Sequence, residues 1–197
     1  MPTQAPAENI FARRYEVIVV GAGHAGVEAA LACARMGRST LLLTQNLDTI
    51  AAMSCNPSIG GVGKGQMVRE LDALGGEMAK AADRSSTFSQ TLNLSKGAAV
   101  HSPRAQCDKA AYRLGQKSII ERTPGLDPIQ DEAWSLWLCG SRLRGVISRR
   151  GTRYEGTTVV LTTGTFLNGL AHVGLSTHAA GRGGEAPALG LTASLRE

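Results

Sequence analysis

The first 44 residues alternate between short apolar runs and one helical pattern. Tyr15 to Val20 is a continuous apolar run rich in β-branched residues, which is typical of a buried strand. Glycines break the run at 21–26, and the Ala-, Leu- and Glu-rich stretch from 25 to 36 predicts a helix that Gly37 ends. Thr40 to Thr44 predicts a second buried strand. A right-handed crossover would make the two strands parallel neighbours.

The middle of the chain begins with a long stretch rich in Asn, Ser, Pro and Gly, at residues 45–63. Long loops in compact domains are usually functional. After it, the periodicity predicts three helices and one strand. We expect the helices at 64–74, 77–82 and 104–120, and the strand at 88–94. In the first of these helices Met67, Val68, Leu71 and Leu74 fall on one face.

The last third has a β-like pattern. Strands are expected at 134–138, 143–148 and 157–162, with Gly140 and Gly151 in the turns, and a helical pattern begins at 189. A doubly wound fold needs more strands than these. The pattern therefore predicts an α/β, Rossmann-like dinucleotide fold that is incomplete. We expect a flexible lead-in at 1–14 and one domain at 15–197.

Composition narrows the class of protein. The formal net charge is +5 and the pI is near 9.3, which is compatible with a polyanionic partner but is not specific to one. No apolar run reaches the roughly 18 residues of a membrane span, and residues 1–14 lack the apolar core of a secretory signal. We therefore expect a cytoplasmic protein without a membrane partner.

The four cysteines are not spaced as metal ligands. No pair forms C-x-x-C, so we expect neither a zinc or other metal site nor a disulfide framework. Cys33, Cys107 and Cys139 are interpreted as small core residues. Cys55 differs, because it lies in the long loop, in the run M-S-C-N-P-S-I-G-G.

The glycine turn matches G-x-G-x-x-G between a strand and a helix, the context that gives this motif its meaning. Gly21 would permit the tight turn, Gly23 would admit a pyrophosphate, and Gly26 would let helix and strand pack closely. The alternative is a turn used only for packing. The predicted cofactor-binding set at this turn is Gly21, Ala22, Gly23, His24, Ala25 and Gly26.

Two further segments bear on which dinucleotide is bound. The acidic residue that usually binds the ribose about 20 residues on is replaced by Thr44, which weakens an NAD site without excluding a dinucleotide. The run T-T-V-V-L-T-T-G at 157–164 resembles the strand of FAD-dependent oxidoreductases that returns beside the first strand. It favours FAD and adds Thr163 and Gly164 to the predicted site; the alternative is another buried strand and turn.

The cysteine loop has two possible interpretations. In flavin-disulfide reductases the reactive cysteines also follow the second strand of the FAD fold, so Cys55 is a candidate reactive thiol, and an inert loop cysteine is the alternative. The neighbouring glycines at 60–65 do not complete G-x-x-x-x-G-K-S/T, because Gly65 replaces the hydroxyl residue. A nucleoside triphosphatase is therefore excluded, and we interpret this segment as a backbone anion nest or a close approach to a cofactor.

Several runs together resemble one family. In order they are G-A-G-H-A-G-V-E-A-A, M-S-C-N-P-S-I-G-G-V-G-K-G, E-L-D-A-L-G-G-E-M-A-K-A, S-K-G-A-A-V, P-R-A-Q-C-D and T-T-G-T-F-L-N-G. They are similar to the MnmG (GidA) family of tRNA uridine 5-carboxymethylaminomethyl modification enzymes. The resemblance implies a cytoplasmic homodimer that binds FAD and uses NADH and methylene-tetrahydrofolate. With a GTPase partner, MnmE, it would modify carbon 5 of the wobble uridine in tRNA.

The resemblance also implies roles for single residues. Cys55 matches a catalytic cysteine, as nucleophile at carbon 6 or as general acid or base. Ala133 matches a position whose backbone meets the adenine side of FAD, and Thr44 is the family's ribose residue. Lys64 and Arg104 are candidate phosphate contacts, with solvated surface charge as the alternative.

Departures from the family leave two other hypotheses open. Ala188 stands where the family often has a serine that contacts FAD, and residues 85–90 diverge from the family's sequence. The chain also stops before the family's second cysteine and its helical carboxyl-terminal domain. The alternatives are a general FAD-dependent oxidoreductase acting on a small molecule and a truncated remnant that binds FAD without catalysis.

Overall fold

The computed structural model describes residues 9–196. Within them a six-stranded sheet has the order β6-β2-β1-β9-β8-β7. β6, β2, β1 and β9 run parallel, and β8 and β7 continue the sheet as antiparallel strands. The strands are β1 Tyr15–Val20, β2 Thr40–Thr44, β6 Leu126–Gln130, β7 Ala133–Cys139, β8 Arg142–Ser148 and β9 Arg153–Leu161.

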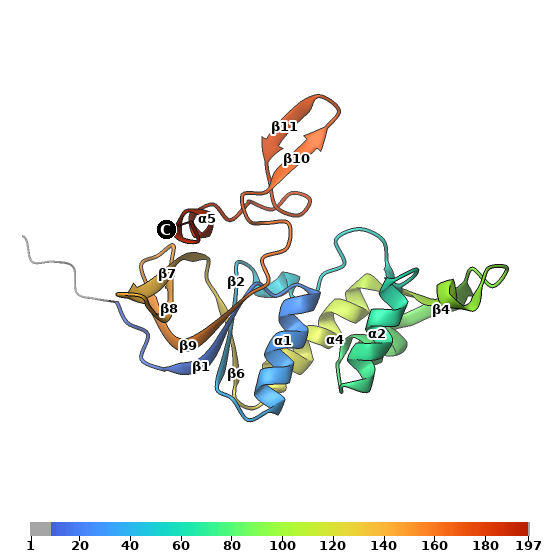
Figure 1. Cartoon of the computed structure of the whole chain (residues 1–197), viewed down its shortest axis with the longest axis horizontal. Coiled ribbons are helices and arrows are strands. Elements are labelled where there is room, and N and C mark those ends of the chain that lie inside the picture. Colours follow the sequence, from blue (N-terminus) through green and yellow to red (C-terminus); the bar gives the residue numbers. More distant parts are fainter. Residues whose placement is uncertain (1–8, 197) are drawn as a thin grey trace, which may run out of the picture.

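A second group of elements lies beyond α1 (His24–Arg35), on the side away from the β7–β8 hairpin (Figure 1). It contains a small antiparallel sheet, β3-β5-β4, and three helices. Its elements are β3 Ser58–Gly60, α2 Lys64–Ala73, α3 Met78–Ser85, β4 Ser86–Leu92, β5 Ser102–Cys107 and α4 Lys109–Arg122. Short 3₁₀ helices occupy Leu47–Thr49 and Ala98–Val100.

The last described part of the chain forms a hairpin and a short helix. β10 (Leu170–Val173) and β11 (Ser176–Ala179) pair antiparallel and project away from both sheets (Figure 1). α5 (Gly190–Ser194) returns to the main sheet and contacts β7. Only the helix was expected from the sequence in this region.

The apolar run of β1 is continuous because both faces of the strand are buried. Val19 packs with α1 and α4 in one core cluster, whereas Ile18 and Val20 pack with residues of the β7–β9 region in another. This alternation is the period of a strand. The run is therefore read correctly as a buried parallel strand, and the predicted parallel pairing of β1 with β2 is confirmed.

A buried carboxylate joins α1 to α3. Glu28 accepts hydrogen bonds from the backbone N–H groups of Glu77, at 2.9 and 3.0 Å, and of Met78, at 2.5 Å. Glu77 itself pairs with Arg35 at 2.8 Å and Arg84 at 2.5 Å. A carboxylate at a helix N-terminus satisfies N–H groups that have no partner within the helix. Glu28 thus caps α3 from a different helix.

One predicted helix begins too early. Residues 104–107 belong to β5, which pairs with β3 and β4, and the helix starts after Asp108. The Asp108 side chain accepts hydrogen bonds from the N–H groups of Ala110 and Ala111, so it is the N-cap. The helix buries Tyr112, Gln116 and Ile120, while Leu114 is exposed.

Met67 of α2 and the C-cap residue Leu74 are 57% and 87% exposed, so the apolar face of this helix does not enter a core within the described residues. Two of the expectations about buried cysteines are wrong. Cys139 is exposed and Cys33 is half-buried, whereas Cys107 is buried as expected. All four cysteines are free.

The expected lead-in at 1–14 falls partly outside the described residues, which start at 9. Within residues 9–14, Phe11 packs against the second core cluster and its N–H donates to the carbonyl of Arg153 at 2.9 Å. Arg13 pairs with Asp127 at 2.6 Å. Residues 11–13 are therefore packed and hydrogen-bonded against the domain.

Residues 9–196 contain no helix with the length and apolarity needed to cross a membrane.

Candidate cofactor site and cysteine pocket

The three glycines of the turn between β1 and α1 have different surroundings. Gly21 has φ +100°, and a Cβ there would lie 2.5 Å from the carbonyl oxygen of Thr162. A Cβ on Gly26 would lie 1.8 Å from the carbonyl oxygen of Gly21. A Cβ on Gly23 would meet no atom within 4 Å. Two glycines are thus required by packing, and the middle one faces open space at the start of α1.

The end of β9 closes over this turn. The Thr162 hydroxyl donates to the carbonyls of Val20 and Gly21, both at 2.9 Å. The backbone N–H of Thr162 also donates to the Val20 carbonyl, at 2.9 Å. Thr163 and Gly164 follow directly, and Gly164 has φ +55°. The carboxyl end of the returning strand therefore lies at the glycine turn, as the T-T-V-V-L-T-T-G run predicts.

Thr44 ends β2 at the same edge of the sheet, and Ala133 begins β7 shortly after the end of β6, the strand beside β2. The Thr44 carbonyl accepts the N–H of Asp131 at 2.9 Å, and Ala133 is buried at the start of β7. Beside them is a cavity of about 350 Å³ with a polar lining that includes Gln45, Gln130 and Glu132.

Asp131 fixes one wall of this cavity. It accepts a hydrogen bond from the Tyr154 hydroxyl at 3.1 Å, and burial together with this carboxylate raises the Tyr154 pKa to about 12. Tyr154 therefore remains a neutral donor. Asp131 was not identified from the sequence, because the bond depends on contact between β9 and the segment after β6.

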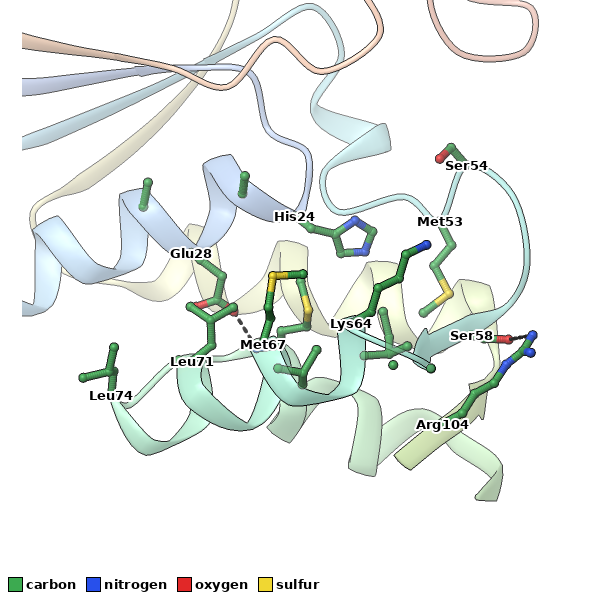
Figure 2. A pocket seen from close by; sticks show the side chains of 18 of the residues that line it. His24, Glu28, Met53, Ser54, Ser58, Lys64, Met67, Leu71, Leu74 and Arg104 are labelled. Carbon is green, nitrogen blue, oxygen red and sulfur yellow. Dashed lines mark hydrogen bonds between the residues drawn. The ribbon is translucent and has the colours of Figure 1, made fainter. Parts of the chain in front are cut away.

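A larger pocket of about 1250 Å³ lies between α1, α2 and the loop after β2 (Figure 2). One end is apolar: Met67 and Leu71 of α2 and its C-cap residue Leu74 lie there, opposite α1. The other end carries the polar candidates. His24, Cys55, Lys64 and Arg104 all line this pocket.

His24 begins α1 and closes the polar end of the pocket. Its ring lies 5.7 Å from the ring of Tyr112, and within the described residues its buried Nε2 has no hydrogen-bond partner. Burial, assisted by the positive charge of Arg182, lowers the His24 pKa below its usual value of 6.5. The ring is therefore neutral near pH 7.

Cys55 is exposed at the rim of the pocket. Its backbone carbonyl accepts a hydrogen bond of 2.6 Å from Lys109 Nζ, and its Sγ lies 3.8 Å from Asn56 Oδ1. Two residues earlier in the loop, Met53 is buried. The thiol is thus accessible, while the backbone of Cys55 is held in place by the hydrogen bond from Lys109.

The two predicted basic contacts line the same pocket as this thiol. Lys64 is the first residue of α2, and Arg104 on β5 donates to the Ser58 hydroxyl at 3.0 Å. Arg104 is therefore held by the neighbouring strand β3. The structure brings the predicted residues together as two groups, one along the glycine turn and sheet edge and one around Cys55, with His24 in both.

Parallel strands with the glycine turn at the amino end of α1 define a Rossmann-like α/β protein of the dinucleotide-binding class. A family model described as glucose inhibited division protein A matches residues 16–197, so the chain belongs to the GidA family.

The relatives are consistent with this family. The chain is 56% identical over 183 residues to the tRNA uridine 5-carboxymethylaminomethyl modification enzyme MnmG of Pelobacter propionicus, covering 93% of this chain and 29% of that protein. It is 47% identical to GidA of Aquifex aeolicus, with a TM-score of 0.88 over 93% of this chain and 31% of that one. The GidA-related protein of Thermus thermophilus is 26% identical, with a TM-score of 0.68 over 93% of this chain and 68% of that one.

The chain thus spans about 30% of the length of the curated relatives that it matches.

Proposed function

We propose that the chain forms an FAD-binding domain, residues 15–197, whose glycine turn holds the cofactor pyrophosphate. The observation that supports this most directly is the open space at Gly23 between two glycines that packing requires. The start of α1 supplies N–H groups without intrahelical partners and the positive end of a helix dipole. The proposed contacts run from Gly21 through Ala22, Gly23, His24 and Ala25 to Gly26, with Thr163 and Gly164 beside them.

The adenosine end of the cofactor would lie along the sheet edge, towards Thr44 and Ala133. The polar cavity of about 350 Å³ beside these residues supports this direction. Amide and carboxylate groups such as Gln45 and Asp131 suit the ribose hydroxyls and the adenine edge, and they replace the single acidic residue of the usual motif. Bound flavin would supply the redox chemistry, while this chain supplies binding and orientation.

The activity that we propose is the modification of tRNA wobble uridine, together with the remaining parts of a GidA-family enzyme. This rests on the family and on relatives named as tRNA uridine 5-carboxymethylaminomethyl modification enzymes. NADH, methylene-tetrahydrofolate, the GTPase partner MnmE, a homodimer and a cytoplasmic location belong to the same proposal.

Cys55 would act on the uracil ring. As a nucleophile, its thiolate bonds carbon 6, and the electron pair of the ring double bond makes carbon 5 nucleophilic. As a general acid or base, it moves a proton at carbon 5. An exposed thiol whose backbone is held by a hydrogen bond from Lys109 fits both roles. Lys64 and Arg104, which line the same pocket, are proposed to contact tRNA phosphates.

FAD titration of Gly23→Ala tests the cofactor site. Gly23 has φ −72° and no atom within 4 Å of its Cβ position, so alanine fits the protein without strain. The methyl group would occupy the space through which the pyrophosphate approaches. We expect FAD affinity to fall about tenfold or more, equivalent to ~1.4 kcal/mol, while the melting temperature is unchanged.

Gly115→Ala is the matched control, since Gly115 lies within α4 and its Cβ position is also open. It should leave FAD affinity unchanged. Absence of flavin binding by the wild-type chain, or equal binding by Gly23→Ala, would contradict the proposed site.

A further inference from the structure

The loop that carries Cys55 is held by one face of α4. Lys109 donates to the Cys55 carbonyl at 2.6 Å. Arg113 donates to the carbonyl of Asp48, and Lys117 donates to the carboxylate of Asp48 at 2.6 Å. All three bonds come from cationic side chains, and together they reach both ends of the segment from 48 to 55.

The spacing of these cations places them in one row. Lys109, Arg113 and Lys117 are four residues apart, so they lie on the same face of α4 and span about 12 Å along the helix. A loop that lies against this face can therefore be fixed at two separate places. Lys117 is the more covered of its pair, with 22% of its side chain exposed against 79% for Asp48.

The middle of the segment is fixed to the glycine turn. Ile50 and Ala51 are fully buried, and the Ala51 N–H donates to the Ala22 carbonyl at 2.8 Å. Ala51 has φ +54°, a conformation that alanine rarely adopts, so the surrounding contacts determine the path of the backbone there. The loop is thus fixed at its middle from the core and at its ends from α4.

We propose that Lys109 is a positioning residue for Cys55, and that the cationic row of α4 holds the cysteine loop in a single conformation at the pocket. The inference rests on the proposed role of Cys55 and concerns a residue to which the proposed function assigns no part.

The chemical reason is the geometry of attack. Covalent or acid–base chemistry on a ring carbon requires the reacting atoms to be held close and aligned, and small displacements reduce the rate strongly. The Cys55 side chain has one rotatable bond before its sulfur, so the backbone largely sets where the sulfur lies. A charged hydrogen bond to the carbonyl of the same residue limits the motion of that backbone directly.

Backbone ¹⁵N relaxation of the 197-residue chain tests the proposal. In the wild-type chain, order parameters at 54–56 should be near those of rigid backbone, about 0.85. In Lys109→Met they should fall to about 0.6 or below, with the order parameters of β1 and α1 unchanged. Lys109→Arg, which retains a charged donor, should restore most of the order.

Two other variants act as controls. Lys117→Met should leave 54–56 ordered, because Lys117 binds the Asp48 end of the loop, together with Arg113, and Lys109 binds the Cys55 end. Lys80→Met, at an exposed lysine of α3, should change neither segment. Unchanged order at 54–56 in Lys109→Met would overturn the proposal, as would a loss of order spread over the whole chain, which would make Lys109 a general stabilising residue.

This result is independent of the proposed reaction. The order parameters are measured without FAD or tRNA, so they remain informative if Cys55 proves not to be catalytic. Failure of the proposed function would appear instead as retained uridine modification in a Cys55→Ser enzyme.

Discussion

The glycine turn and the cysteine loop are joined by a hydrogen bond from the Ala51 N–H of the loop to the Ala22 carbonyl of the turn, but their conformations are held by different kinds of contact. The turn is fixed by backbone atoms, with carbonyls close enough to exclude a Cβ at Gly21 and Gly26. The exposed parts of the loop are fixed by long cationic side chains from α4. Gly21 and Gly26 of the turn should therefore tolerate almost no substitution, whereas the loop should loosen locally and leave the fold intact.

The strongest test of this difference is Gly26→Ala. Its Cβ would lie 1.8 Å from the carbonyl oxygen of Gly21 and 2.6 Å from Thr162 Oγ1, so helix and strand must separate. We expect the free energy of unfolding to fall by about 3 kcal/mol or more, and FAD binding to be lost with it. Denaturant unfolding measures the effect.

Gly23→Ala in the same turn is the comparison, since there the fold should survive. If Gly26→Ala is as stable as the wild-type chain, the turn is not as closely packed as described, and the contrast with the loop fails.

The fold near the turn was predictable because its signals are local. A buried strand, three spaced glycines and a helix follow one another in a single short segment, and the contact that excludes a Cβ at Gly26 comes from Gly21 of the same turn. β6 shows the opposite case. Its sequence L-D-P-I-Q contains Pro128 and was not recognised as a strand, but β6 is the edge strand beside β2, where proline is tolerated.

Three residues of the pocket around Cys55 could be selected as candidates from the sequence, but their arrangement could not. Cys55, Lys64 and Arg104 were selected from their motifs, and all three line one pocket. Lys109 was missed because it contacts Cys55, which lies more than 50 residues away in the sequence. Asp131 was missed because it follows β6, which was not recognised as a strand, and its partner is Tyr154 on β9. The apolar row of α2 was correctly read as one face, but its burial could not be inferred from periodicity alone.

A smaller effect is expected where α1, the helix that follows the glycine turn, contacts α3. Glu28 caps α3 by accepting three hydrogen bonds from two backbone N–H groups, and its carboxylate is buried. Glu28→Gln keeps the shape but replaces one acceptor oxygen with a donor that faces N–H groups. We expect a loss of about 2 kcal/mol in the free energy of unfolding, measured by denaturant unfolding.

Glu70→Gln provides the control, since Glu70 is exposed on α2 and the same chemical change there should alter stability by less than about 0.5 kcal/mol. Equal effects of the two substitutions would mean that the cap contributes little, and that α3 is held to α1 mainly by the ion pairs of Glu77.

The smallest expected effect concerns His24, which belongs to both regions. Its pKa in the folded chain is lowered by burial, so the unfolded chain binds a proton more readily below the unperturbed value of about 6.5. Stability should therefore be unaffected by His24 above that pH and should fall as the pH decreases through it, with a slope of at most ~1.4 kcal/mol per pH unit for one proton.

The measurement is denaturant unfolding between about pH 7.5 and about pH 5.5, a range that brackets the unperturbed histidine pKa. It compares the wild-type chain with His24→Phe, which keeps a ring against Tyr112 but cannot titrate. As the pH falls, the wild-type chain should lose stability relative to His24→Phe. A difference that stays constant over this range would show that His24 titrates alike in the folded and unfolded chains. The polar end of the pocket would then be open to water at this residue, and the glycine turn would be sealed only by its backbone contacts.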